Sequence, residues 1–309
     1  MYQFKNVTVG LALGEQDKTK IRYAGLVSWL ASSERITFSH IVSREKLPEK
    51  SGAGVPPSIE KTTRRLMKEL VEQYYDGPPA TKIEYDIIPE SPLVEIEILR
   101  RLREQAADLI ILGKISGDFT GEETVPVSIS RKAACSTLYV PKEVEPRTNQ
   151  PHEITILVPV DFSENAADAM RLAIDFAVAH EIPSIYCVHV YDVPLGYYKR
   201  GKEYEEFAEV MEKNAQQKCQ EFIKDINFKG IYLNPIIVRI HKKPYETIAE
   251  TVEEYGVDLV IIGSRGKNAA ARFLLDSVTE QLIRTTAAPL LSYKKKGKDM
   301  SLFEALLRL

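Results

Sequence analysis

Residues 257–293 read VDLVIIGSRGKNAAARFLLDSVTEQLIRTTAAPLLSY, and this segment gives the clearest indication of the fold. It opens on an apolar run, 259–262, which is typical of a strand buried on both faces of a parallel sheet. A glycine-containing loop, 263–266, follows, and a helix is predicted to start near Ser277. A strand, a glycine turn and a helix N-terminus together can hold an anion. The sequence therefore raises the question whether this loop binds a phosphate.

Length and composition restrict the class of protein. The chain has 309 residues, enough for about two domains. It has 44% hydrophobic and 28% charged residues, as in soluble globular proteins. The net charge of −3 does not favour nucleic acid as a partner. No apolar run approaches the ~20 residues of a membrane span, and no signal peptide is apparent. We therefore expect a cytoplasmic protein without stable membrane insertion.

The cysteines and the short motifs exclude several kinds of chemistry. Cys135, Cys187 and Cys219 have no CxxC spacing, so we expect buried, reduced thiols and no zinc site. The sequence contains no GxxxxGK[ST], GxGxxG, GxSxG, HxGH or SGGxDS motif. Histidines and carboxylates do not cluster as in a metal enzyme. We therefore predict no catalytic residues and no metal ligands.

The chain contains an internal repeat. Three pairs of segments match at offsets of 150 (258 − 108), 149 (189 − 40) and 152 (244 − 92). The pairs are ADLIILG at 107–113 with VDLVIIG at 257–263, SHIV at 39–42 with VHVY at 188–191, and Pro92 and Ile96 with Pro244 and Ile248. Near-constant offsets predict two copies of one domain.

Each copy shows alternating strand and helix patterns. In the second copy we predict strands at 154–160, 184–190, 231–240, 259–262 and 290–293, and helices at 165–179, 204–226, 245–255 and 278–286. In the first copy we predict strands at 7–13, 36–42, 83–88, 109–112 and 137–140, and helices at 21–30, 59–75 and 93–105. This order predicts an α/β fold of two tandem, doubly wound, five-stranded parallel sheets with helices on both faces.

The predicted boundaries follow from the repeat. The first domain spans 1–142, a polar, proline-rich linker spans 143–152, and the second domain spans 153–294. Residues 295–309 form a basic linker and an amphipathic C-terminal helix, with the apolar residues Leu302, Phe303, Leu306 and Leu309. Such a short helix is marginal alone, so we expect it to dock on its own chain or on a dimer mate. A groove of a protein partner and membrane attachment behind the lysine run are the alternatives.

The second copy contains a set of motifs typical of one protein family. They are VPVDFS at 158–163, GSRGK at 263–267, LL at 274–275, SVTE at 277–280 and Pro289. With these motifs the second copy resembles the universal stress proteins, which are also called UspA-like proteins. Over residues 1–142 the resemblance rests on the internal repeat, because the first copy matches the second. The resemblance implies the Rossmann-like adenine nucleotide α-hydrolase (HUP) fold with strand order 3-2-1-4-5. It also implies pseudo-twofold related halves joined through the last strand, and therefore a homo-oligomer or an intramolecular pseudo-dimer. Some members of the family bind ATP and others do not.

The resemblance implies a nucleotide site in the second copy. Nucleotide-binding members carry Gly, two residues, Gly, nine residues, then Gly and Ser or Thr. Gly263, Gly266 and Ser277 fit this pattern, but Asp276 stands at the third glycine. An Asp can adopt a left-handed backbone and cap a helix, so the fold tolerates it. Its carboxylate, however, would repel a phosphate ~4 Å away by about 4 kcal/mol at an effective dielectric near 20. Both a site for ATP with Mg and a structural turn without nucleotide stay open.

The residues implied in this site come from the strand ends and the glycine loop. They are Pro159, Val160, Asp161, Ser163, Val190, Gly263, Ser264, Arg265, Gly266, Lys267, Asp276, Ser277, Val278 and Thr279. Asp161 occupies the position from which the family contacts the nucleotide, and an N-cap role shared with Ser163 is the alternative. Val190 would offer its backbone to adenine. His40 and His189, at equivalent strand ends, are interpreted as hydrogen-bonded core histidines.

The first copy has lost the glycine spacing. No Gly-x-x-Gly follows Gly113, Glu123 and Thr124 align with the third glycine and the Ser, and Gly14 aligns with Asp161. Further acids, Asp118 and Glu122, disfavour a triphosphate. We therefore expect a non-binding copy that contributes a pseudo-dimer interface.

These observations predict a non-catalytic stress-response binding module that senses an adenine nucleotide through its second domain. Two alternatives stay open. One is a nucleotide-free interaction protein that uses the dimer surface and the C-terminal helix. The other is a slow ATPase in which Asp161 helps to position metal or water.

Overall fold

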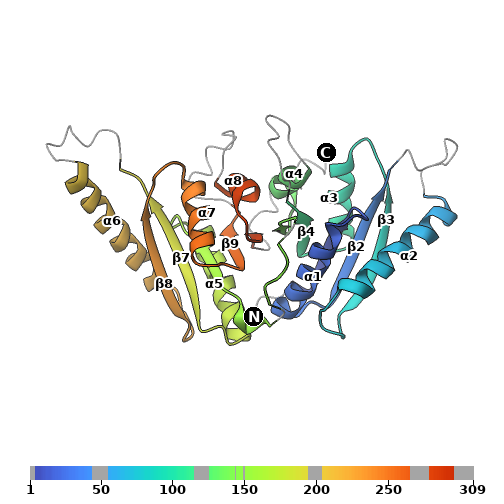
Figure 1. Ribbon diagram of the computed structural model, residues 1–309, viewed down its shortest axis with the longest axis horizontal. Coiled ribbons are helices and arrows are strands. Elements are labelled where there is room, and N and C mark those ends of the chain that lie inside the picture. Colours follow the sequence, from blue (N-terminus) through green and yellow to red (C-terminus); the bar gives the residue numbers. More distant parts are fainter. Residues whose placement is uncertain are drawn as a thin grey trace. The chain divides into compact units, whose positions relative to one another are not determined.

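The computed structural model describes residues 4–43, 55–114, 125–142, 144–148, 150–193, 204–264 and 278–295. The chain divides into two compact units, which Figure 1 colours along the sequence. The first unit is Met1–Pro151 with the segment from Lys294 onward, and the second is His152–Tyr293. Of the predicted C-terminal helix, residues 296–309 lie outside the described part.

The first unit is a five-stranded parallel sheet with helices on both faces. Its strands are β1 (Asn6–Leu11), β2 (Arg35–Val42), β3 (Lys82–Pro89), β4 (Leu109–Gly113) and β5 (Ser136–Val140). Its helices are α1 (Asp17–Ala31), α2 (Pro57–Tyr74), α3 (Val94–Glu104) and α4 (Val125–Lys132). The strands lie in the order β3-β2-β1-β4-β5. α1 packs against α2, and α3 packs against α4.

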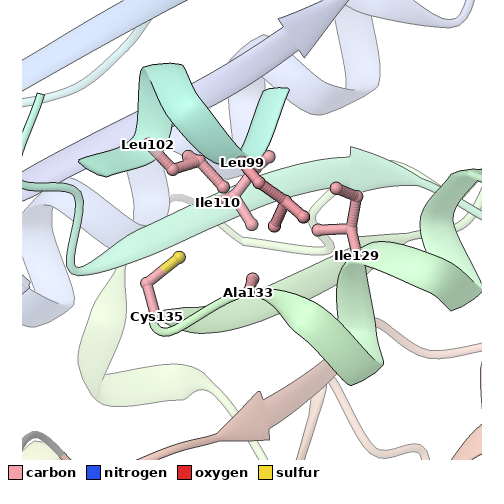
Figure 2. Close-up of a cluster of buried hydrophobic side chains, with 6 residues drawn as sticks. All are labelled: Leu99, Leu102, Ile110, Ile129, Ala133 and Cys135. Atoms are coloured by element: carbon pink, nitrogen blue, oxygen red, sulfur yellow. The ribbon is translucent and has the colours of Figure 1, made fainter. Parts of the chain in front are cut away.

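Alternation along β4 explains how both faces become covered. Ile110 packs with Leu99 and Leu102 of α3 and with Ile129 of α4, as Figure 2 shows. Gly113 is three residues further and faces the other side of the sheet. A Cβ at Gly113 would lie 3.8 Å from Cδ of Lys20 in α1. Both faces of β4 are therefore covered by helices, which explains the continuous hydrophobic run in its sequence.

The second unit repeats this architecture. Its strands are β6 (Ile156–Pro159), β7 (Ser184–Tyr191), β8 (Tyr232–Arg239), β9 (Leu259–Gly263) and β10 (Leu290–Tyr293). Its helices are α5 (Glu164–Ala179), α6 (Tyr204–Lys224), α7 (Pro244–Glu254) and α8 (Val278–Thr285). The order β10-β9-β6-β7-β8 is the predicted order 3-2-1-4-5 read from the other end. The predicted fold class is confirmed, and the pseudo-twofold relation between the halves stays a prediction.

The repeat extends to individual hydrogen bonds at the start of the fourth strand of each unit. In the first unit, the Asp108 carboxylate accepts from the Asn6 N–H at 3.0 Å and the Asp108 N–H donates to the Asn6 carbonyl. In the second unit, the Asp258 carboxylate accepts from the Thr155 N–H at 2.7 Å and the Asp258 N–H donates to the Thr155 carbonyl. Both aspartates fasten the fourth strand to the first, which explains their place in the repeated sequence.

Several details of the sequence analysis differ from the structure; for example, the helix expected at 21–30 begins four residues earlier, at Asp17. The sequence does not predict helix α4, because its eight residues include Pro126 and three β-branched residues, which weaken the helical pattern. The match of Ile96 with Ile248 is wrong: with the offset of 150 that β3 and β8 keep, Ile248 corresponds to Ile98. Ile96 is accordingly 59% exposed, whereas Ile248 is 5% exposed.

Among the described residues, no helix has the length and apolar character needed to cross a membrane. No group of three or more His, Cys, Asp or Glu within that same part of the chain is placed to hold a metal ion.

Candidate functional site

The strand order places a topological switch point at the carboxyl edge of the second sheet, the edge at which its parallel strands end. β6 lies between β9 and β7, and the chain order reverses between β6 and β9. Open α/β sheets bind ligands outside such a reversal point. Pro159, at the end of β6, and Gly263, at the end of β9, lie at this point.

The structure describes most of the predicted site residues. Those at the ends of β6, β7 and β9 or directly after them are Pro159, Val160, Asp161, Ser163, Val190, Gly263 and Ser264. Val278 and Thr279 begin α8, which packs against α7 and β10. Arg265, Gly266, Lys267, Asp276 and Ser277 lie outside the described residues. The strand ends therefore meet as predicted, and the roles of these residues toward a ligand stay predictions.

A hydrogen-bonded turn joins β6 to α5. The Val160 N–H donates to the Val188 carbonyl at 2.8 Å, which extends the sheet by one residue. Asp161 Oδ1 then accepts from the Ser163 N–H at 3.0 Å. Ser163 Oγ accepts from the Ala166 N–H at 3.2 Å and caps α5. The N-cap role therefore belongs to Ser163, while Asp161 stabilises the turn that precedes the helix.

An aromatic cluster supports this turn. Phe162, between Asp161 and Ser163, has a left-handed backbone with φ of 60°. Its ring lies 4.2 Å from the His189 ring and 5.6 Å from the Phe222 ring, centroid to centroid. His189 Nδ1 donates to the Val160 carbonyl at 2.9 Å, so the predicted hydrogen-bonded histidine is confirmed. No pattern in the sequence indicates this role of Phe162, because an aromatic residue rarely adopts a left-handed backbone.

Gly263 is required by close packing. A Cβ on Gly263 would lie 2.6 Å from the backbone oxygen of Asn165, in the first turn of α5. Since backbone atoms cannot move aside cheaply, only glycine fits at the end of β9. This requirement holds without any phosphate, and it reflects the close packing of the start of α5 against the end of β9.

The corresponding edge of the first unit contains its own anion. The N–H groups of Ala12, Leu13 and Gly14 point to Asp17 Oδ2, at 3.0, 2.6 and 3.3 Å. Leu13 has a left-handed backbone with φ of 59°, which turns its N–H toward the carboxylate. Successive N–H groups that converge in this way form an anion-binding nest. Asp17 is fully buried, and Lys20 Nζ lies 2.7 Å from its Oδ1.

The two turns correspond residue by residue. Leu13 and Phe162 are the left-handed positions, an offset of 149 (162 − 13). The carbonyls two residues earlier, of Leu11 and Val160, accept from His40 at 3.0 Å and from His189 at 2.9 Å. Asp161 therefore corresponds to Ala12 and Ser163 to Gly14, so the expected alignment of Gly14 with Asp161 is wrong by two residues.

The same offset shows which residues replace the buried ion pair. Asp17 and Lys20 of the first unit correspond to Ala166 and Ala169 of the second. Both alanines are buried, at 4% and 0% exposure. Two methyl groups thus occupy the helix positions from which the first unit sends a carboxylate and an ammonium group into its carboxyl edge.

A buried lysine also distinguishes the first unit. Lys114 follows Gly113 at the end of β4, where the second unit has Ser264 (264 − 114 = 150), and its N–H donates to the Val140 carbonyl. Burial lowers the pKa of Lys114 to about 7, because the charged form loses hydration. The acids Asp118, Glu122 and Glu123 and their neighbour Thr124 lie outside the described residues. The internal anion found at this edge is Asp17, which the sequence analysis missed.

Comparison with known proteins identifies relatives of the second unit. The model of the Universal stress protein family matches residues 155–294. A universal stress protein of Methanocaldococcus jannaschii is 31% identical over 159 residues, which cover 46% of this chain and 95% of that protein. A second universal stress protein of the same organism is 27% identical over 146 residues, covering 47% of this chain and 84% of that protein.

A solved structure is similar along nearly the whole chain. The crystal structure of a universal stress protein from Archaeoglobus fulgidus superimposes with a TM-score of 0.62 at 17% identity. The match covers 95% of this chain and 99% of that one. At this identity the similarity concerns the fold, and it extends to both units.

Proposed function

Because the chain belongs to the universal stress protein family, we propose that it is a non-catalytic stress-response module whose second unit senses an adenine nucleotide. The proposed site lies at the carboxyl edge of β6, β7 and β9, where the end of β9 at Gly263 packs against Asn165 at the start of α5. Some members of the family bind ATP. The nucleotide acts here by stabilising one conformation of the second unit, and Mg accompanies it as the counter-ion of the phosphates.

The difference between the two carboxyl edges carries this proposal. In the first unit, the Asp17 carboxylate takes the N–H groups of the turn after β1. In the second unit, Ala166 stands at the place of Asp17 and brings no charge to that edge. Because α5 sends no carboxylate into this edge from position 166, the edge is suited to an external phosphate at the N-terminus of α5.

Thermal unfolding of the full chain with and without ATP and Mg tests the proposal. Ligand at ~100 times its dissociation constant adds about 2.7 kcal/mol to the stability of the folded state. We expect an upward shift that grows with ATP concentration and is absent with adenosine, which lacks phosphates. An unchanged midpoint at millimolar ATP would contradict nucleotide sensing.

A double variant provides the matched control for the location of the site. Ala166→Asp with Ala169→Lys places the ion pair of the first unit at the corresponding positions of the second. We expect this variant to lose the ATP-dependent shift because its own carboxylate occupies the edge. Circular dichroism establishes that it is folded. A folded double variant that keeps the full shift would place the nucleotide elsewhere.

The residue at position 276 provides a second variant. Asp276 replaces the third glycine of the nucleotide-binding pattern. Since like charges ~4 Å apart cost about 4 kcal/mol at an effective dielectric near 20, Asp276→Gly is expected to tighten ATP binding. A dissociation constant unchanged by this substitution would show that the carboxylate lies away from the phosphates.

A further inference from the structure

Helix α3 of the first unit carries an exposed apolar patch at its N-terminal end. Leu93, which directly precedes the helix, is 61% exposed, and Ile96 in its first turn is 59% exposed. We call these two residues the α3 patch. Leu99 and Leu102 of the same helix point instead toward α4, as Figure 2 shows. The α3 patch therefore lies outside the cluster that holds α3 to its own unit.

The corresponding helix of the second unit is polar at these positions. α3 and α7 keep the offset of 150 (244 − 94), so Lys243 stands at the place of Leu93 and Glu246 at the place of Ile96. Lys243 is exposed and Glu246 is partly exposed. The fold of the unit thus forms with charged residues at both places. Adjacent exposed apolar side chains that the fold does not need are typical of an interaction surface.

The chain returns to the first unit directly after β10. Lys294 belongs to the first unit and is 6% exposed. Its N–H donates to Ser136 Oγ at 3.1 Å, and its Nζ donates to the Ala133 carbonyl at 2.6 Å. Ser136 begins β5, and Ala133 directly follows α4. The segment after Lys294 therefore starts from a fixed point beside the end of α4.

This fixed point is connected to the first turn of α3. Lys132, the neighbour of Ala133, places its Nζ 2.9 Å from Glu95 Oε2. Glu95 directly precedes Ile96 in α3. The five residues 296–300 span up to about 18 Å when they are extended, which is more than the length of one lysine side chain. Residues 301–309 can therefore reach the α3 patch.

We propose that residues 301–309 of this chain form a short helix that docks its apolar side on the α3 patch of the same chain. Leu302, Phe303 and Leu306 lie on one side of such a helix. A helix of this length is marginal in water, so it forms where it can bury apolar surface. The α3 patch offers that surface, and the contact covers Leu93 and Ile96.

Charge and tethering favour this occupant over a second copy of the chain. The segment that leads to residues 301–309 carries lysines at 295, 296 and 298, and the first turn of α3 carries Glu95 and Glu97. Opposite charges of this kind orient a contact. Because Lys294 is held on the first unit, the segment meets the α3 patch at the millimolar effective concentration of a short linker.

Cysteine cross-linking in the full chain tests the proposal. The three native cysteines are free and buried. Ile96→Cys with Leu306→Cys should form a disulfide within one chain on mild oxidation, because docking brings the two positions together. The matched control, Glu246→Cys with Leu306→Cys, uses the corresponding position of the second unit and should react at least about tenfold more slowly. Equal rates would overturn the proposal, and so would disulfides found only between chains, which would place the segment on a second copy.

Release of the segment by a single substitution gives a second test. Ile96→Glu puts a charge into the α3 patch, and the fold tolerates it because Ile96 is exposed and an acid is favourable in the first turn of a helix. Chymotrypsin should then cleave after Phe303 at least about fivefold faster, because cleavage follows the population of the released segment. Tyr232→Glu, which removes a 68% exposed aromatic residue from the second unit, should leave this rate unchanged.

The same rate of cleavage in the wild-type protein and in Ile96→Glu would show that the α3 patch does not hold the segment. Neither test involves a nucleotide, so the outcome is independent of ATP binding.

Discussion

The turns after β1 and β6 follow the same backbone path but meet different side chains. Both contain a left-handed residue, Leu13 or Phe162, and both are anchored by a histidine from the neighbouring strand. In the first unit the Asp17 carboxylate fills the turn, whereas in the second the corresponding residue is Ala166. The comparison shows that two copies of one domain can keep the same turn while one of them fills it with its own anion.

The buried ion pair of the first unit allows the strongest test of this comparison. Asp17→Ala removes the acceptor of three N–H groups and leaves Lys20 buried without its ion partner. We expect a loss of about 3–5 kcal/mol in the free energy of unfolding, measured with urea. The double variant Asp17→Ala with Lys20→Ala should lose less, because no uncompensated charge stays buried. A loss below about 1 kcal/mol for the single variant would mean that the nest does not stabilise the turn.

The pH dependence of stability sharpens the comparison of Lys114 with its counterpart Ser264. Lys114 has a pKa of about 7 in the folded protein, below the ~10.4 of an unfolded chain. Below pH 7 the folded and the unfolded protein both carry the Lys114 proton, so burial of this charge lowers the free energy of unfolding by its full amount. Above it the unfolded state binds more protons, so stability rises with pH by up to about 1.4 kcal/mol per unit. Urea unfolding between pH 7 and 9 measures this slope, and Lys114→Met should remove it. Equal slopes in the two proteins would contradict the lowered pKa.

A matched pair of glycine substitutions compares the ends of β4 and β9. A Cβ at Gly263 meets the Asn165 backbone at 2.6 Å, whereas at Gly113 the nearest atom is Lys20 Cδ at 3.8 Å. We expect Gly263→Ala to cost about 1–3 kcal/mol through overpacking. Gly113→Ala should be neutral or stabilise by less than about 1 kcal/mol, because it restricts the unfolded chain. Equal effects on the free energy of unfolding would show that the close approach of α5 is not specific to the second unit.

The smallest effect is expected at the cap of α5. Ser163 Oγ accepts from the Ala166 N–H, and the corresponding residue in the first unit, Gly14, has no side chain. Ser163→Ala should therefore destabilise the second unit by about 1 kcal/mol, and Ser163→Gly by only a few tenths. Thermal unfolding measures both. If the alanine variant were as stable as the wild-type protein, the hydroxyl would not act as the cap.

The sequence predicts the fold well because the repeat and the apolar strands are local patterns. The two five-stranded sheets, their order and the roles of His40 and His189 agree with the structure. Asp17 was not predicted, because its role depends on the left-handed backbone of Leu13, which no residue type in the turn indicates. The acids after Gly113, on which the expectation of a non-binding first copy rested, lie outside the described residues. Side chains that converge through tertiary packing leave no spacing in the sequence.

Hydrogen exchange of the full chain, measured peptide by peptide with and without ATP and Mg, tests whether a nucleotide binds at the carboxyl edge of the second unit and not at that of the first. The N–H groups of the turn after β1 already donate to Asp17, so ATP should not change their exchange. The turn after β6, which contains Asp161 and Ser163, and the end of β9 should exchange more slowly when the nucleotide is bound. Protection confined to the second unit is the result that this account predicts. Equal protection of both turns, or of neither, would contradict it.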